Sequence, residues 1–274
     1  MSPILSVEET KKQAAIKAVE DHFDPSARYV GIGSGTTIVY VVEAIKAKST
    51  NPTIQFVPTG YQSRQVIVEA GLTPIAFDSL PANEVLDVAF DGADEVDDEL
   101  NCIKGGGACL FQEKLVAERA KKFICVADYR KAQSRLLTQW PSIPIEVAPL
   151  AAQTVAHALR QLGSIDPLVR THSLAKTGPV KTDQDFFIID APFKKLLTAS
   201  DVAAGTAGDG KDGVWEVSAL SKKIKAITGV LEVGIFSGED GDAAQKKGGW
   251  GGQKPVAVYF GMQDGSVLVR HAPK

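Results

Sequence analysis

Two kinds of hydrophobic pattern alternate through the first half of the chain. Short runs of consecutive apolar residues stand between longer stretches in which apolar residues recur every third or fourth position. Continuous apolar runs are typical of strands buried on both faces, and the longer spacing is typical of helices with one buried side. The expected strands are residues 29–32, 54–57, 72–77, 85–90 and 123–127, and the expected helices are 6–23, 38–48, 62–70 and 108–121.

This alternation predicts an α/β fold with a Rossmann-like, largely parallel sheet and helices on both of its faces. Ser6 and Glu9 have the spacing of a capping box, which marks the start of the first helix. Sheets of this kind bind ligands beyond the carboxyl ends of their strands. We therefore expect functional residues directly after the apolar runs.

The pattern changes after Pro141. The sequence Pro141-Ser142-Ile143-Pro144 is typical of a linker, and a mixture of strands and helices follows it. We predict a catalytic domain over residues 1–141 with 254–274, and a smaller α+β domain over 142–253 that is involved in oligomerisation. Residues 199–213 and 237–254 are rich in Gly, Asp and Lys, and we interpret them as mobile surface insertions.

Composition narrows the possible partners. The 274 residues are 44% hydrophobic and carry a formal charge of −3, which argues against a nucleic-acid-binding surface. The chain has three cysteines without a paired spacing, as expected for reduced thiols in a cytoplasmic protein. No apolar run approaches the length needed to span a bilayer, and we expect no membrane partner.

The first glycine-rich turn is Gly31-Ile32-Gly33-Ser34-Gly35-Thr36-Thr37. It is a poor dinucleotide fingerprint, because Thr36 stands where glycine is required and the next expected strand ends without a carboxylate. Hydroxyls and backbone N–H groups at a helix start suit a single phosphate monoester. Hydroxyls that only cap the helix are the alternative.

An acidic run follows the strand at 85–90 and starts with Asp91 and Asp94. These two carboxylates adjoin the strand end and the turn residue Gly92, so we expect them to face substrate hydroxyls. A calcium loop is excluded, because Ala93 occupies a position that needs an oxygen ligand. The later acidic residues are interpreted as a solvated loop; they are Glu95, Asp97, Asp98 and Glu99.

Lys104 precedes three consecutive glycines, Gly105–Gly107. Such a turn lets backbone approach a ligand closely, and the ammonium group can stabilise an enediolate oxygen or a phosphate. A surface lysine on a flexible loop is the alternative. Lys131 also follows a strand end, and could contact a phosphate or a sugar hydroxyl.

Glu113 is the only ionisable residue in an otherwise apolar arc of the helix predicted at 108–121. A carboxylate among apolar side chains is harder to ionise, which suits a general base near neutral pH. A carboxylate buried with a lysine or arginine is the alternative. Lys114, Glu118 and Lys121 form a separate stripe, which we expect to be solvated. The four histidines have no metal-ligand spacing, and no metal site is expected.

Together these motifs resemble ribose-5-phosphate isomerase of the A type in order and spacing. The resemblance covers almost the whole chain, and the segments 58–65 and 188–193 resemble the eukaryotic branch. The matching motifs are the turn at 31–37, Asp91-Gly92-Ala93-Asp94-Glu95, Lys104-Gly105-Gly106-Gly107-Ala108, Glu113-Lys114 and Ile124-Cys125-Val126-Ala127-Asp128.

The resemblance implies an aldose–ketose isomerase that interconverts D-ribose 5-phosphate and D-ribulose 5-phosphate in the non-oxidative pentose phosphate pathway. It implies a cis-enediol intermediate, no cofactor, and a homodimer or homotetramer. Glu113 would carry the proton, Asp91 and Asp94 would move hydroxyl protons, and Lys104 would stabilise negative charge. The remaining substrate-binding residues that it implies are Ser34, Gly35, Thr36, Thr37, Gly92, Ala93, Gly105, Gly106, Gly107 and Lys131.

Two other functions share this architecture. One is a sugar-phosphate-binding regulatory module, which would also need a DNA-binding element. The other is an enzyme similar to coenzyme A transferases, in which Glu113 would be a nucleophile rather than a base. The sequence pattern alone leaves both open.

Overall fold

The computed structural model describes residues 5–171 and 177–272, and the chain divides into two compact units. Unit 1 comprises Met1–Ala93, Gln112–Ala132 and Gly238–Lys274, and unit 2 comprises Asp94–Phe111 and Gln133–Ser237. The predicted boundaries stay a prediction. The compact units differ from them in where residues 94–111, 133–141 and 238–253 belong.

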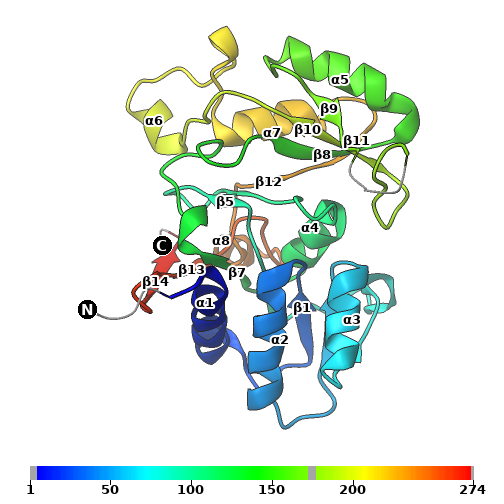
Figure 1. Ribbon diagram of the computed structural model, residues 1–274, viewed down its shortest axis with the longest axis vertical. Coiled ribbons are helices and arrows are strands. Elements are labelled where there is room, and N and C mark those ends of the chain that lie inside the picture. Colours follow the sequence, from blue (N-terminus) through cyan, green and yellow to red (C-terminus); the bar gives the residue numbers. More distant parts are fainter. Residues whose placement is uncertain (1–4, 172–176, 273–274) are drawn as a thin grey trace. The chain divides into compact units, whose positions relative to one another are not determined.

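Unit 1 is built on a seven-stranded sheet with the order β14-β13-β7-β4-β1-β2-β3 (Figure 1). Neighbouring strands are parallel except at the β13–β14 edge, where they are antiparallel. The strands are β1 (Tyr29–Ile32), β2 (Gln55–Pro58), β3 (Thr73–Pro74), β4 (Val88–Asp91), β7 (Phe123–Asp128), β13 (Ala257–Gly261) and β14 (Val267–His271). The predicted parallel α/β sheet is confirmed.

Helices cover both faces of this sheet. Helices α1 and α2 pack against each other and against β7, and Figure 1 shows α3 beside α2. On the other face, a Cβ at Gly31 of β1 would lie 2.5 Å from Val116 of α4, so helix and strand approach too closely for a larger residue. The helices are α1 (Val7–His22), α2 (Thr36–Lys48), α3 (Tyr61–Glu69), α4 (Leu110–Glu118) and α8 (Gly241–Lys246), with 3-10 turns η1 (Phe77–Ser79) and η2 (Tyr129–Lys131).

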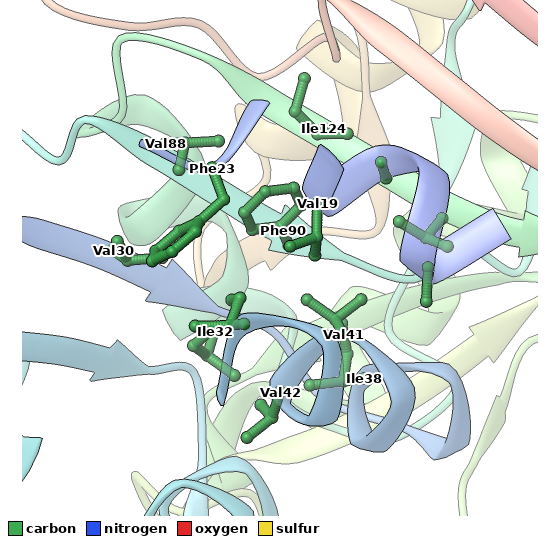
Figure 2. Packing of buried hydrophobic residues seen from close by; sticks show 14 of the residues in the cluster. Val19, Phe23, Val30, Ile32, Ile38, Val41, Val42, Val88, Phe90 and Ile124 are labelled. Carbon is green, nitrogen blue, oxygen red and sulfur yellow. The ribbon is translucent and has the colours of Figure 1, made fainter. Parts of the chain in front are cut away.

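The core of unit 1 lies between the sheet and helices α1 and α2. Figure 2 shows how Phe90 of the sheet packs among Val19 of α1 and Val41 of α2. Each such side chain, fully buried, contributes about 1.5–3 kcal/mol of hydrophobic stabilisation. The first helix begins as predicted, because Ser6 and Glu9 form a reciprocal capping box. This packing fixes where the strands end, and so positions the polar residues that follow them.

Unit 2 has two small sheets. One has the order β11-β8-β10-β9 with antiparallel pairing, and the other has the order β12-β6-β5. The elements are β5 (Glu95–Val96), β6 (Cys102–Ile103), β8 (Ile143–Val147), η3 (Pro149–Ala151), α5 (Ala152–Gln161), β9 (Leu168–Val169), β10 (Phe187–Ala191), α6 (Ala199–Ala203), η4 (Lys211–Gly213), α7 (Val217–Lys225), β11 (Val230–Val233) and β12 (Ile235–Phe236). The predicted α+β character of this region is confirmed.

The two segments interpreted as insertions contain ordered elements. Helix α6 has a capping box between Thr198 and Asp201, and Arg135 forms a bidentate ion pair with Asp201. Helix α8 is capped by Asp240, whose side chain accepts from the N–H of Ala243. The hydrophobic pattern did not predict these two short helices, because the segments are rich in Gly, Asp and Lys. Each helix is instead marked by its capping residue.

The interpretation of the later acidic residues as solvated is wrong for two of them. Glu95 and Asp97 are fully buried. The Glu95 carboxylate accepts four backbone N–H groups, from Leu137, Thr138, Gln139 and Trp140. Four donors replace the lost hydration, so this glutamate holds the 137–140 loop in place.

Candidate active site

Three polar residues meet at the carboxyl edge of the parallel sheet in unit 1. The Ser34 hydroxyl donates to Oε1 of Glu113 at 2.6 Å, and the Ser34 N–H donates to Oδ1 of Asp91 at 3.1 Å. Asp91 is 2% exposed and Glu113 is 4% exposed. The sequence placed Ser34 after β1, Asp91 at the end of β4 and Glu113 on α4, and the fold brings these three together.

Gly33 makes the close approach of β1 and Asp91 possible. A Cβ at this position would lie 1.9 Å from Oδ1 of Asp91. The same oxygen also accepts the N–H of Gly92 at 2.7 Å. Main-chain donors thus fix the Asp91 carboxylate. No residue larger than glycine fits at position 33 without displacing this carboxylate.

The backbone turn before α2 is held by a residue that sequence reasoning missed. Gly35 has a φ of +96°, a left-handed conformation that favours glycine. Oε1 of Gln62 accepts the Gly35 N–H at 2.8 Å, and Nε2 of Gln62 donates to the Gly35 carbonyl at 3.3 Å. Gln62 lies 27 positions away on α3, so no local pattern linked it to the turn.

Lys11 is a second residue that the sequence did not single out. Its Nζ donates to the Thr36 hydroxyl at 2.9 Å and to Glu8 at 2.7 Å, and its side chain is only 12% exposed. The ammonium group therefore lies at the N-terminus of α2, beside the backbone N–H groups of the first helical turn. A cation and a helix N-terminus together suit an anionic group.

Lys131 lies in η2, directly after β7, and is half-buried. The buried Asp128 precedes it and forms an ion pair with Arg130 at 2.6 Å. Burial acts to raise the pKa of Asp128, but hydrogen bonds from the side chain and backbone of Arg130 outweigh it, and the pKa is lowered. Arg130 and, to a smaller extent, the positive charge of Lys131 offset the negative charge of Asp128.

Of the remaining predicted residues, Thr37 and Ala93 belong to unit 1, and Asp94, Lys104 and Gly105–Gly107 belong to unit 2. Oδ2 of Asp94 accepts the N–H of Gly106 at 2.8 Å, and Gly105 has a φ of +101°. Lys104 is 3% exposed, and its Nζ lies 5.4 Å from the centre of the Phe236 ring. The lysine is therefore not a solvated surface residue, and the glycine turn is fixed against the Asp94 carboxylate.

The expectation for Lys114 is wrong. Lys114 was placed on a solvated stripe with Glu118 and Lys121, but it is 3% exposed, whereas Glu118 and Lys121 are exposed as predicted. Within residues 5–171 and 177–272, no group of three or more His, Cys, Asp and Glu side chains has the arrangement of a metal site. No helix in the same residues has both the length and the apolar content needed to cross a membrane.

Known proteins resemble this chain over nearly its full length. Ribose-5-phosphate isomerase of Mycosarcoma maydis is 43% identical over 275 residues, which cover 99% of this chain and 84% of that protein. The enzyme of the same name from Schizosaccharomyces pombe is 42% identical over 273 residues, covering 99% of this chain and 85% of the relative.

Solved structures give the same result. A D-ribose-5-phosphate isomerase in complex with phospho-erythronic acid superposes with a TM-score of 0.78 at 30% identity, covering 97% of this chain and all (100%) of the other. Ribose 5-phosphate isomerase A of Methanocaldococcus jannaschii gives a TM-score of 0.75 at 28% identity, with 97% and 100% covered. The sequence profile of ribose 5-phosphate isomerase A (phosphoriboisomerase A) matches residues 55–245, and the chain belongs to this family.

Proposed function

We propose that Glu113 is the general base of an aldose–ketose isomerisation that interconverts D-ribose 5-phosphate and D-ribulose 5-phosphate. The reaction is that of the family. The observation that carries the assignment of Glu113 is its burial at the carboxyl edge of the sheet, hydrogen-bonded to Ser34. Parallel sheets bind their ligands at this edge, and a buried carboxylate there is positioned to remove a proton from carbon.

In the proposed mechanism, the Glu113 carboxylate removes the proton from C2 of the open-chain aldose. The electron pair forms the C1–C2 double bond of a cis-enediol, and the carbonyl oxygen at C1 gains the negative charge. O1 then takes up a proton, and the O2 hydroxyl loses one as the C2–O2 double bond forms. The proton returned from Glu113 to C1 completes the ketose. Carbon gains and loses one proton, so no electron acceptor is needed.

Asp91 and Asp94 contact the sugar hydroxyls in this proposal and carry protons to and from O1 and O2. Lys104 supplies positive charge to the oxygen that becomes negative in the transition state, and the Gly105–Gly107 turn supplies backbone donors. Gly92 and Ala93 line the substrate site beside Asp91. The support for these roles is the burial of Asp91 and Lys104 and the hydrogen bond from Gly106 to Asp94.

The phosphate binds at the N-terminus of α2 in this proposal. Ser34, Gly35, Thr36 and Thr37 form this site: Thr36 and Thr37 present hydroxyl and N–H donors, and the N–H groups of Ser34 and Gly35 fix the turn by donating to Asp91 and Gln62. Lys11 adds a cation within hydrogen-bond distance of Thr36. Lys131 is the second candidate cation. A phosphate monoester needs several donors and neutralising charge, which the helix N-terminus and these lysines provide.

The two alternative functions have less support. Neither a regulatory sugar-phosphate module nor a coenzyme A transferase is what the full-length relatives from Mycosarcoma maydis and Schizosaccharomyces pombe are named for. The homodimer or homotetramer, the cytosolic location and a reaction without a cofactor stay proposals. Light scattering during size-exclusion chromatography measures the assembly directly.

The test of the proposed reaction is isomerisation of ribose 5-phosphate in D₂O with a chelator present. Proton transfer through a solvent-exchanging base predicts deuterium at the reacting carbon of the product, with a rate unaffected by the chelator. Phospho-erythronic acid, whose carboxylate resembles the enediolate, is expected to inhibit competitively. Product without deuterium, together with loss of activity in the chelator, would instead indicate a metal-assisted hydride shift.

A further inference from the structure

Arg170 of unit 2 has no role in the reaction described so far, yet it contacts the glycine turn directly. Its Nη1 donates to the carbonyl of Gly105 at 3.1 Å and to the carbonyl of Gly106 at 3.0 Å. Its Nε and Nη2 donate to the two carboxylate oxygens of Asp190 at 2.7 and 2.6 Å. The guanidinium group thus joins two consecutive peptide groups of the turn to the end of β10.

The backbone of both partners is also fixed. The N–H of Arg170 donates to the carbonyl of Ile188 at 2.7 Å, which continues the pairing of β9 with β10. The side chain of Arg170 is 12% exposed. The Arg170 guanidinium group has little freedom, because the Arg170 backbone and the Asp190 carboxylate belong to the same sheet. It can therefore hold the two carbonyls at defined positions.

The direction of the two carbonyls determines the direction of two N–H groups. In a trans peptide the C=O and the following N–H point in nearly opposite directions, and the peptides of this turn are trans. The N–H of Gly106 accordingly points away from Arg170, and Asp94 accepts it at 2.8 Å. The N–H of Gly107 belongs to the peptide of the Gly106 carbonyl, so it also points away from Arg170.

The Gly105 carbonyl also accepts the N–H of Ala108 at 3.0 Å, which closes the turn. A cavity of 420 Å³ lies on the side that faces Arg170, lined by the turn, by Arg170 and Asp190, and by Trp140, Pro141, Ser142 and Val180. Four of the five guanidinium N–H donors are used by Asp190 and the two carbonyls, so the group offers little to a second anion. Its place in the cavity wall makes it a support for the turn.

We propose that Arg170, held by Asp190, is a positioning residue that aims the Gly106 N–H at the Asp94 carboxylate and the Gly107 N–H to the same side. The inference rests on the proposed function, in which this turn orients Asp94 and supplies a donor to the enediolate. Arg170 does not touch the substrate in this account. It acts through two peptide groups of the turn. It keeps their N–H groups oriented before the negative charge of the enediolate develops.

The experiment compares R170Q with R135Q in full steady-state kinetics with ribose 5-phosphate. Arg135 is a matched control, because it forms the same bidentate fork with Asp201, at 2.6 Å for both bonds, in the same unit. We expect R170Q to lower kcat about 10- to 100-fold, the range for donors misplaced by a fraction of an ångström to one ångström. KM should change less than kcat, and R135Q should keep near-normal kcat.

Melting temperature separates positioning from folding. Both variants lose one ion pair, so comparable losses of melting temperature with unequal losses of kcat support the proposal. Equal kcat in R170Q and R135Q overturns it. If R170Q does not fold, R170K is measured instead: its ammonium group can reach Asp190 but cannot satisfy the carboxylate and both carbonyls, so kcat should still fall. An inactive wild-type protein would refute the proposed function, whereas an active wild type with a normal R170K refutes only this inference.

Discussion

The two glycine turns of this protein are built alike but supported differently. In unit 1, Gly33 lies against the Asp91 carboxylate and Gln62 holds the peptide of Gly35. In unit 2, Gly106 lies against the Asp94 carboxylate and Arg170 holds two carbonyls. The first turn connects a buried parallel strand to a helix, whereas the second is carried by short strands and an ion pair.

The difference concerns which backbone groups remain for a ligand. Gln62 is a neutral amide that takes one N–H and one carbonyl of Gly35, so it immobilises the turn and uses a donor. Arg170 takes only carbonyls, so the Gly106 N–H is directed at Asp94 and the Gly107 N–H to the same side. We infer that the first turn gains its anion affinity from hydroxyls, Lys11 and the helix N-terminus, and the second from oriented peptides.

The largest expected effect comes from adding a methyl group at the closest glycine. In G33A the Cβ would lie 1.9 Å from Asp91, so the carboxylate must move by about 1 Å or more, and kcat/KM should fall about 100-fold or more. In G106A the nearest Asp94 oxygen is 2.8 Å away, and a small rotation relieves the contact. We expect a loss of about 10-fold for G106A, measured in the same assay.

The opposite order of the two losses would contradict the difference inferred between the two turns. A larger loss of kcat/KM in G106A than in G33A would mean that the turn in unit 2 tolerates less displacement than the contact with Asp91. Circular dichroism of both variants shows whether a loss of activity reflects the site or a loss of fold.

A smaller effect is expected from removing the amide that holds the first turn. Q62A loses two hydrogen bonds to Gly35 at an exposed position, each worth about 0.5 kcal/mol, so KM should rise about fivefold while kcat changes little. Q65A is the control, since it removes an amide of the same helix that does not contact Gly35. A fall in kcat without a change in KM would assign Gln62 the same role as Arg170.

The smallest expected effects are on the free energy of unfolding. Its pH dependence has opposite signs for a histidine in unit 1 and an aspartate in unit 2. Burial, followed by the charge of Lys122, lowers the pKa of His22 in unit 1 to about 4. Its unfolded-state pKa is about 6.5. The unfolded chain therefore binds the extra proton, and stability is lost as pH falls from about 6.5 to about 4. H22Q should flatten this loss, whereas H157Q, which replaces an exposed histidine, should not.

Asp97 in unit 2 has the opposite sign. Burial raises its pKa to about 6, and hydrogen bonds from Asn101 and Glu99 only partly oppose this. The folded chain binds the proton more tightly, so Asp97 stabilises the fold below about pH 4 and this stability is lost as pH rises to about 6. D97N should steepen the acid loss that H22Q flattens. Urea unfolding of wild type, H22Q and D97N between pH 4 and 7 measures both slopes, and equal slopes would contradict the assignment.

Much of unit 1 could be predicted because its signals are local. Continuous apolar runs gave the strands, and the residues directly after them, such as Ser34 and Asp91, form the cluster around Glu113. The apolar arc on α4 identified Glu113 as buried, which the structure confirms. Because parallel strands all end at the same edge of the sheet, the residues that directly follow the strands in the sequence lie close together in the fold.

The supports of the turns could not be predicted, because they are not local. Gln62 and Arg170 reach backbone groups 27 and 64–65 positions away, and their partners are carbonyls and N–H groups common to every residue. Glu95 was mistaken for a solvated residue, because the four N–H groups that bury it come from a loop more than 40 positions later. Hydrophobic period carries no information about such pairings.

The central claim is that the Glu113 carboxylate carries the proton between the two carbons. The most direct measurement is the rate of deuterium incorporation from D₂O into product by E113Q, with E118Q as the control on the exposed end of the same helix. The account predicts that E113Q loses about 10²–10⁴-fold in both turnover and deuterium incorporation, while its melting temperature and E118Q remain close to wild type. Deuterium incorporation by folded E113Q at the wild-type rate would contradict it.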